Sequence, residues 1–374
     1  MLKKIGILTF HAAHNYGSML QAYALQTYLE RQGCQAVIIN MRTPGQKAVY
    51  GKPTRHLTKK NLKAAWANPY LFIRNLEKWD KFEQFMETHL HLSREHFSLV
   101  DSERIINQEL GLDAIITGGD QIWNLECLDL SLAYILPFET PGIRRVAYSP
   151  SLGDGEFWVP QHYGAILKQT VEGYDFPSVR EVSASAFLSE LLGCQVPVVP
   201  DPTLLLERQD YETLAGHDSL VKGDYVFYYS PQPDRQIAEY VSKFARAHGY
   251  KVVSPNKGLA KEEKSFISYN NSGPLEFLNL LKNAAVVCGR SFHLPVFSII
   301  FHKPFFALGK TEGMRIKSFL APFGLADRYF MTSDNERIEG ELSPIDWEIT
   351  DRTLLAQRRV GEAFLENALK DNHD

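Results

Sequence analysis

The chain has 374 residues, of which 44% are hydrophobic, 12% aromatic and 22% charged. This length is too great for one ordinary hydrophobic core and predicts two soluble globular domains. The formal net charge of -4 gives no overall field that favours nucleic acid or membrane as a partner, and no apolar run reaches the roughly 18 residues of a membrane span.

The first elements predicted along the chain form a β-α-β unit. Residues 3–10, KKIGILTF, are typical of a buried strand that stops at the polar turn HAAHNYG. Apolar residues then recur at helical spacing from Ser18, and Gly33 is a suitable helix end. A second apolar run follows at residues 35–40. This order predicts a parallel, doubly wound sheet.

Two features indicate the cellular compartment. The amino-terminal apolar run has about five residues, fewer than the roughly 7 to 15 of a secretory signal. No C-x-x-C pair occurs among the four cysteines, which argues against a zinc site or a disulfide scaffold; they are Cys34, Cys127, Cys194 and Cys288. We expect reduced thiols and a cytoplasmic protein.

Residues from about 45 to 110 are predicted to form a helical insert with an amphipathic stretch at 69–86. Between Lys47 and Glu83 there are nine Lys or Arg and three Asp or Glu. A solvated helical face explains this excess, and so does an anionic partner. The basic segment 47–81 is therefore a candidate for peripheral contact with a membrane surface.

Four more runs predict strands of the first domain, each stopping at small or polar residues: 112–124, 144–155, 174–181 and 194–206. A second alternation of strands and helices begins near Tyr225, after a polar stretch. We expect domains at 1–210 and 211–374, with a final helix that either caps the second domain or returns to the first. The ligand crevice of such sheets lies at the carboxyl ends of the strands.

The sequence lacks the common dinucleotide, phosphate-loop, zinc-protease and hydrolase motifs. In HAAHNYGS, free amides at a helix start would favour an anion, although Asn15 and Ser18 also suit capping. His11 and His14 have no carboxylate or cysteine near them in the sequence, so we expect no metal site.

Three further junctions carry candidate chemistry. Asp120, after two glycines, suits either a sugar hydroxyl or a turn cap. Arg180 suits a carboxylate or phosphate ligand, or an ion pair with a local acid. Arg290, Ser291 and His293 follow an apolar run, and a histidine there suits general acid catalysis or merely fills a helix start.

A series of segments, in this order, resembles the polysaccharide pyruvyl transferase family from about residue 4 to 330. They are NYGSMLQAYALQTYL, DAIITGGDQIWN, AYSPSLG, PSVRE, VVPDPTLLL, GPLEFLNLLKNAAVVCGRSFHLPVFSIIFHKPF and FGLADRY. The resemblance implies an α/β fold of two Rossmann-like domains facing a cleft, as in GT-B glycosyltransferases. It also implies transfer of a pyruvyl group from phosphoenolpyruvate to two hydroxyls of a sugar, giving a cyclic ketal without a metal or organic cofactor.

The resemblance also implies roles for individual residues. His293 matches the family's histidine and would be the general acid, and Arg180 would contact phosphoenolpyruvate, with Arg290 and Ser291 beside the donor. The residues expected on the acceptor side of the cleft are Asn15, Tyr16, Gly17, Asp120 and Gln121.

The chain departs from the family pattern around its histidine. Many members carry an arginine where Ser291 stands, and Leu294 and Pro295 replace a small pair. The alternatives are therefore a GT-B-like glycosyltransferase that uses a nucleotide sugar, or a diverged glycan-binding member without catalysis. The acceptor, nucleotide-linked or lipid-linked, and the oligomeric state stay open.

Overall fold

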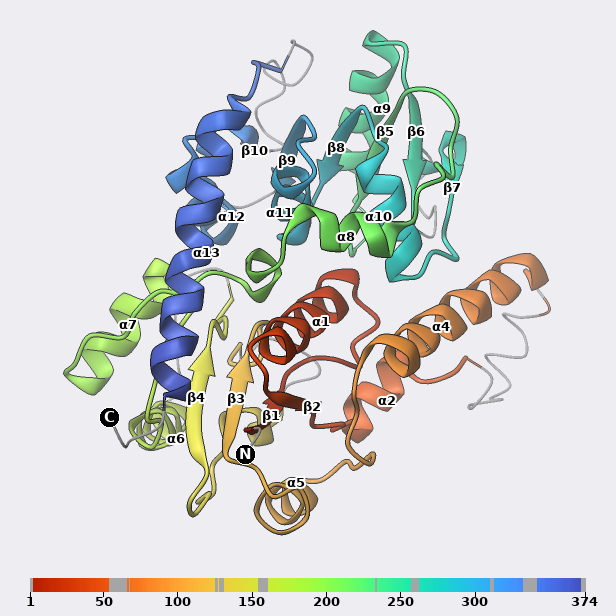
Figure 1. The fold of residues 1–374 in the computed structure, drawn as a ribbon. Helices are drawn as coiled ribbons and strands as arrows, with labels where there is room; N and C mark the ends of the chain where they lie inside the picture. Colours follow the sequence, from red (N-terminus) through yellow and green to blue (C-terminus); the bar gives the residue numbers. More distant parts are fainter. Residues whose placement is uncertain are drawn as a thin grey trace.

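The computed structural model of the protein describes residues 3–53, 66, 68–124, 127, 131–153, 161–232, 234–256, 262–309, 313–331 and 342–370. Two separate sheets, each parallel throughout and flanked by helices, form the framework (Figure 1). The basic segment 47–81 lies partly outside the described residues, which omit 54–65 and 67.

The first sheet has the strand order β2-β1-β3-β4. Its pairing places Ile5 of β1 opposite Ala36 of β2 and Ala114 of β3. The strands are β1 (Lys4–Leu8), β2 (Gln35–Ile38), β3 (Ala114–Gly118) and β4 (Arg144–Tyr148). Almost all residues of β1, β3 and β4 are buried, as expected where helices cover both faces of a parallel sheet.

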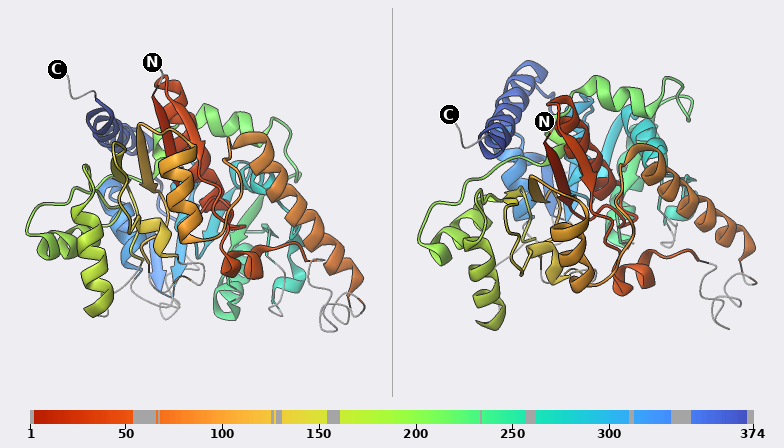
Figure 2. Two further views of the ribbon diagram at one scale, coloured as in Figure 1. Left: turned by 90° about the horizontal axis from the view of Figure 1, so that it is seen from below. Right: turned by 60° about the horizontal axis from the view of Figure 1, so that its bottom comes forward.

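The helices of the first domain begin at recognisable start signals. Asn15 caps α1, Thr43 and Gln46 form a capping box on α2, and proline occupies the first turn of both α2 and α4. The helices are α1 (Tyr16–Arg31), α2 (Pro44–Tyr50), α4 (Pro69–His89), α5 (Leu99–Arg104), η1 (Ile105–Glu109), η2 (Leu132–Ile135), α6 (Gln161–Glu172), α7 (Val182–Leu192) and η3 (Pro202–Leu205). Figure 2 shows α6 and α7 on one flank of this domain and α4 on the other.

The second sheet has the strand order β10-β9-β8-β5-β6-β7. Its strands are β5 (Tyr225–Tyr229), β6 (Lys251–Ser254), β7 (Ile267–Ser268), β8 (Val286–Gly289), β9 (Phe305–Gly309) and β10 (Tyr329–Met331). Its helices are α8 (Arg208–Ala215), α9 (Arg235–Ala247), η4 (Glu262–Ser265), α10 (Pro274–Lys282), α11 (His293–Ile300), α12 (Met314–Leu320), η5 (Ala321–Phe323), η6 (Ala326–Arg328) and α13 (Trp347–Leu369).

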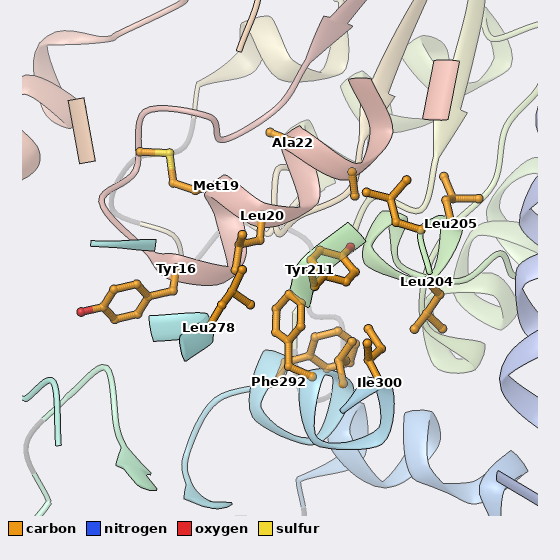
Figure 3. Close-up of a cluster of buried hydrophobic side chains, with 14 of the residues drawn as sticks. Tyr16, Met19, Leu20, Ala22, Leu204, Leu205, Tyr211, Leu278, Phe292 and Ile300 are labelled. Atoms are coloured by element: carbon orange, nitrogen blue, oxygen red, sulfur yellow. The ribbon is translucent and has the colours of Figure 1, made fainter. Parts of the chain in front are cut away.

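One hydrophobic cluster joins the two sheets. Figure 3 shows Leu20 of α1, Leu204 of η3 and Tyr211 of α8 gathered near Phe292 and Ile300 at α11. All five side chains are buried. This part of the boundary between the domains is therefore packed like a core.

The last helix, α13, contacts both domains. Its start lies beside His302, which stacks on Trp347 at 4.7 Å between ring centroids and contacts Asp351 at 2.6 Å. Near its end, Arg144 of β4 donates a 2.9 Å hydrogen bond to the Ala368 carbonyl. The helix thus crosses back to the first domain.

Two predicted strands are absent as continuous elements. Residues 174–181 and 194–206 make only isolated bridges, Phe176 with Val146 and Val179 with Val198. Prolines 177, 197 and 200 interrupt these runs, and proline cannot donate to a sheet. The apolar character there reflects burial, not strand pairing.

His11 makes stability depend on pH. Burial lowers the pKa of this histidine to about 4, although Asn40 Oδ1 accepts a 2.9 Å hydrogen bond from its Nε2. As the pH falls below 6.5, His11 binds a proton in the unfolded chain, but in the folded protein it does so only near pH 4. The free energy of unfolding therefore decreases as the pH falls from 6.5 to 4. We expect this group alone to cost about 2 kcal/mol between pH 7 and pH 5. Urea unfolding of wild type and His11→Gln at pH 7 and pH 5 measures this contribution. If the free energy of unfolding depended equally on pH in both proteins, the prediction would be wrong.

Candidate functional site

The junction between β8 and α11 places His293 at the boundary of the two domains. Gly289 ends β8 with φ of +143°, and a Cβ there would collide with the Tyr229 carbonyl, so only glycine allows the chain to leave the sheet this way. Arg290 follows as an exposed residue and Ser291 is half-buried. His293 is the first residue of α11 and is 7% exposed.

The His293 ring packs directly on the amino-terminal turn of α1. Asn15 caps this helix by accepting a 3.0 Å hydrogen bond from the Gly17 amide. A methyl group built on Gly17 would overlap the imidazole. The amino termini of α1 and α11, one from each domain, therefore meet at His293, and their dipoles favour negative charge there.

A carboxylate faces the same histidine from a third element. Asp201 caps η3 by accepting hydrogen bonds from the Thr203 amide at 3.0 Å and its hydroxyl at 2.7 Å. Its Oδ2 lies 3.6 Å from His293 Nε2. This separation gives an electrostatic pair rather than a hydrogen bond, and Nε2 has no hydrogen-bond partner among the described residues.

Arg180 holds Asp201 in place. Its Nη1 donates to Asp201 Oδ2 at 2.8 Å and its Nε to Glu181 Oε1 at 3.0 Å. Burial alone would lower the pKa of Arg180, but Glu181 and Asp201 raise it above its ordinary value. Burial would raise the pKa of Asp201, yet His293 and Arg180 hold it well below its ordinary value. Both groups are therefore charged at neutral pH.

Phe292 brings a second arginine close to this cluster. The Arg180 guanidinium lies 4.2 Å from the centroid of the Phe292 ring, within cation-π range. The Arg315 guanidinium, from α12, lies 5.7 Å from the same ring. Arg315 and the exposed Arg290 add positive charge beside a cluster in which Arg180 already has anionic partners.

Asp120 and Gln121 follow the end of β3; Asp120 faces the start of α1, whereas Gln121 Oε1 accepts a 2.8 Å hydrogen bond from Asn124 Nδ2. Gly118 and Gly119 have φ of +146° and +87°. Asp120 is buried, and its carboxylate accepts hydrogen bonds from the Ser18 hydroxyl and, at 2.8 Å, from the Gln121 amide. The Asp120 charge also contributes to raising the pKa of Arg180, which connects this junction with the His293 cluster, defined as Gly17, Arg180, Asp201, Phe292 and His293.

The structure brings together His293, Gly17 and Arg180 from distant parts of the sequence. Tyr16 instead lies in the packed boundary, where its ring stacks on Phe277 at 4.4 Å between centroids and its hydroxyl donates to the Ser272 carbonyl.

Sequence reasoning missed Asp201, Phe292 and Arg315. Asp201 was visible in VVPDPTLLL as an acid just past an apolar run, a signal that the strand interpretation obscured. The other two residues carry no pattern that the sequence alone reveals.

The described part of the chain holds neither a metal-binding cluster nor a membrane-spanning helix. No three residues of the His, Cys, Asp and Glu types are placed to hold a metal there. His11 and His14 have separate partners, Asn40 and Glu83 respectively. No helix in the described ranges is both long enough and apolar enough to cross a bilayer.

The contact between Gly17 and His293 can be tested by stability alone. Gly17→Ala is expected to lower the free energy of unfolding by about 1–3 kcal/mol, because the methyl group overpacks against the imidazole. In a His293→Ala background the same change is expected to be neutral or stabilising, since alanine favours a helix over glycine. Denaturant unfolding of wild type, Gly17→Ala, His293→Ala and the double variant gives the coupling free energy between the two positions. Equal costs in both backgrounds would show that the ring does not fill this space.

The chain resembles known proteins both in sequence and in fold. The model of the polysaccharide pyruvyl transferase family matches residues 15–310. Among solved structures, UDP-GlcNAc 2-epimerase from Methanocaldococcus jannaschii superposes with a TM-score of 0.55 at 12% identity, covering 98% of this chain and 99% of that one. A glycosyltransferase from Rickettsia africae gives a TM-score of 0.54 at 10% identity, covering 99% and 100%.

Identities this low show the fold alone, which is the GT-B-like arrangement of two parallel-sheet domains. No curated protein matched the chain. The family match spans most of the sequence and includes Gly17, Arg180, Asp201 and His293. The chain belongs to the polysaccharide pyruvyl transferase family.

Proposed function

We propose that the protein transfers a pyruvyl group from phosphoenolpyruvate to two hydroxyls of a sugar in a cell-surface glycan precursor. The observation that carries this proposal is the pairing of buried His293 with ionised Asp201 at the meeting point of two helix amino termini. An imidazole beside a carboxylate is suited to hold and donate a proton. The amino termini of helices are suited to bind an anionic substrate.

In the proposed reaction, His293 donates a proton to the methylene carbon of phosphoenolpyruvate, and C2 becomes electron-poor. One sugar hydroxyl adds to C2 and releases a proton, and the C2–O bond to phosphate then breaks. The second hydroxyl adds to C2, releases its proton and closes the ketal. One of the two released protons restores His293 and the other leaves with inorganic phosphate, so the atoms and charges balance.

Each remaining residue has a proposed role in this scheme. Arg180 fixes Asp201, and Asp201 orients the imidazole and stabilises its charged form. Arg290 and Arg315 neutralise the phosphate and carboxylate of the donor, with Ser291 beside them. Asn15, Gly17, Asp120 and Gln121 form the wall on the acceptor side. The scheme uses no metal or organic cofactor.

The test combines the intact protein with phosphoenolpyruvate and a panel of free, nucleotide-linked and lipid-linked sugars. A sugar product heavier by pyruvate minus water, with release of inorganic phosphate, supports the proposal. Parallel reactions with nucleotide sugars instead of phosphoenolpyruvate test the glycosyltransferase alternative. Thermal stabilisation by nucleotide sugars but not by phosphoenolpyruvate, without a ketal product, would overturn the proposal.

A further inference from the structure

A cavity of about 300 Å³ lies at a different place from the His293 cluster, in the first domain. The loop after β1, the segment after β2, α2 and α4 enclose it, so it lies by the carboxyl ends of two parallel strands. None of the residues that line it belongs to the His293 cluster. The lining residues used below are Arg42, Tyr50, Lys52, Trp79, Glu83 and Glu95.

One wall of this cavity is aromatic. Trp79 and Tyr50 both line it, and the Trp79 indole N–H donates a 3.0 Å hydrogen bond to the Tyr50 carbonyl. The ring of His14 lies about 6 Å from each of them, with centroid distances of 6.1 Å and 6.0 Å. The polar N–H of Trp79 is already used within the protein, so the indole offers the cavity apolar ring surface, with Lys52 Nζ 4.9 Å from the ring centroid.

The charged side chains of the cavity pair with one another. Arg42 contacts Glu83 at 2.9 Å and Glu95 at 3.7 Å. Lys47 pairs with Glu95, and Lys52 lies 3.5 Å from Asp80. Three cations thus pair with three carboxylates among the described residues.

Glu83 is ionised in this network. Burial would raise its pKa, but His14 and Arg42 hold the pKa below the usual value. A polyanion would meet as much repulsion as attraction in such a cavity. A hydroxyl both donates and accepts hydrogen bonds, so it can bind beside paired carboxylates and cations without adding charge.

The cavity is close to the His293 cluster along the chain. Ala12 lines the cavity and Gly17 contacts the His293 ring. The two positions are five residues apart in the chain, so their Cα atoms lie at most about 18 Å apart. Phe82 of α4 contacts the rings of both His14 and Tyr16, at centroid distances of 5.0 Å and 5.2 Å.

We propose that this cavity binds a neutral sugar ring, with the apolar face of the sugar on Trp79 and its hydroxyls on the paired charges. If the proposed pyruvyl transfer is correct, this ring is a unit of the acceptor glycan next to the one that is modified. Binding of the sugar itself does not depend on that function.

The test follows binding without phosphoenolpyruvate. The indole ¹H–¹⁵N resonance of Trp79, assigned by its absence in Trp79→Phe, is titrated with glucose, galactose, N-acetylglucosamine, lactose and chitobiose. Inorganic phosphate, glucose 6-phosphate and glucuronate are the anionic probes. We expect saturable shifts with at least one neutral sugar and stronger binding of neutral than of anionic probes. Trp79→Ala is expected to weaken binding about tenfold.

A matched control and a change of charge sharpen the result. Trp347 also stacks on a histidine, but in the second domain, so Trp347→Phe should leave the titration unchanged. Glu95→Gln removes one carboxylate and should shift the preference toward glucose 6-phosphate. Stronger binding of anionic probes by wild type, or saturable binding by none of the sugars, would overturn the proposal. A protein that makes ketal but shows no shift at Trp79 would refute this site and leave the proposed transfer intact.

Discussion

Replacing Arg180 with methionine is expected to destabilise the protein by about 3–5 kcal/mol at pH 7, because the Glu181 and Asp201 carboxylates are left buried without their cation. The side chain of Asp201 is fully buried. Chemical unfolding followed by circular dichroism measures the change in free energy. As a matched control, Arg235→Met removes an arginine from an exposed ion pair and should cost at most about 1 kcal/mol.

Removing the charges of Glu181 and Asp201 provides a second measurement of the stability lost in Arg180→Met. Arg180→Met combined with Glu181→Gln and Asp201→Asn should recover part of the lost stability, because no unpaired charge then stays buried. In wild type the depressed pKa of Asp201 stabilises the fold at pH values above its ordinary value, and this contribution is lost on acidification. In the variant, the buried Asp201 carboxylate has lost its cation and takes up a proton more readily, so the penalty of Arg180→Met should shrink as the pH is lowered toward 4. A penalty that is small, or constant with pH, would show that Arg180 is not the counterion of these acids.

Replacing His293 with asparagine is expected to lower the rate of ketal formation by about 10²- to 10⁴-fold, the usual contribution of a positioned acid. The readout is ketal mass and phosphate release under saturating phosphoenolpyruvate, with thermal unfolding to verify the fold. His302→Asn is the matched control: His302 also contacts a carboxylate, Asp351 at 2.6 Å, but lies at the far end of α11. We expect this variant to retain wild-type turnover.

Asp201→Asn extends this prediction because it keeps the shape and removes the charge that faces the imidazole. Its effect on turnover should be nearly absent in a His293→Asn background, since the two residues would act as a unit. A fully active His293→Asn protein would exclude the acid role. If that protein also still bound glycans and served its role in cells, the non-catalytic alternative would replace the transferase.

The β-α-β pattern was predictable from the sequence because buried parallel strands appear as apolar runs, as in KKIGILTF and AAVVCG. The candidate histidine was also predictable, since a polar group directly after such a run falls at the carboxyl end of a strand. The match of residues 15–310 to the family confirms the resemblance drawn from the ordered motifs. The role of each residue at the site stays a prediction.

Contacts between side chains that are far apart in the sequence were not predictable in the same way. Sequence patterns record whether a residue is buried but not what it meets, so Arg180 suited a ligand as well as the acids it contacts in the structure. Tyr16 shows the same limit, because its position beside the first loop does not reveal its stacking on Phe277. The proline-rich runs around 177 and 200 show that apolar content alone does not make a strand.

Helix α13 limits how the two domains can move relative to each other. A helix of 23 residues is about 34 Å long, and it contacts one domain near its start and the other near its end. Because α13 contacts both domains, the domains cannot slide apart unless one of these contacts breaks. A movement that keeps both contacts is a rotation of the domains about the α13 axis. Such a rotation would separate Gly17 from His293 on the side away from α13. If His293 acts as proposed, substrates would approach the imidazole from the side of the molecule away from α13.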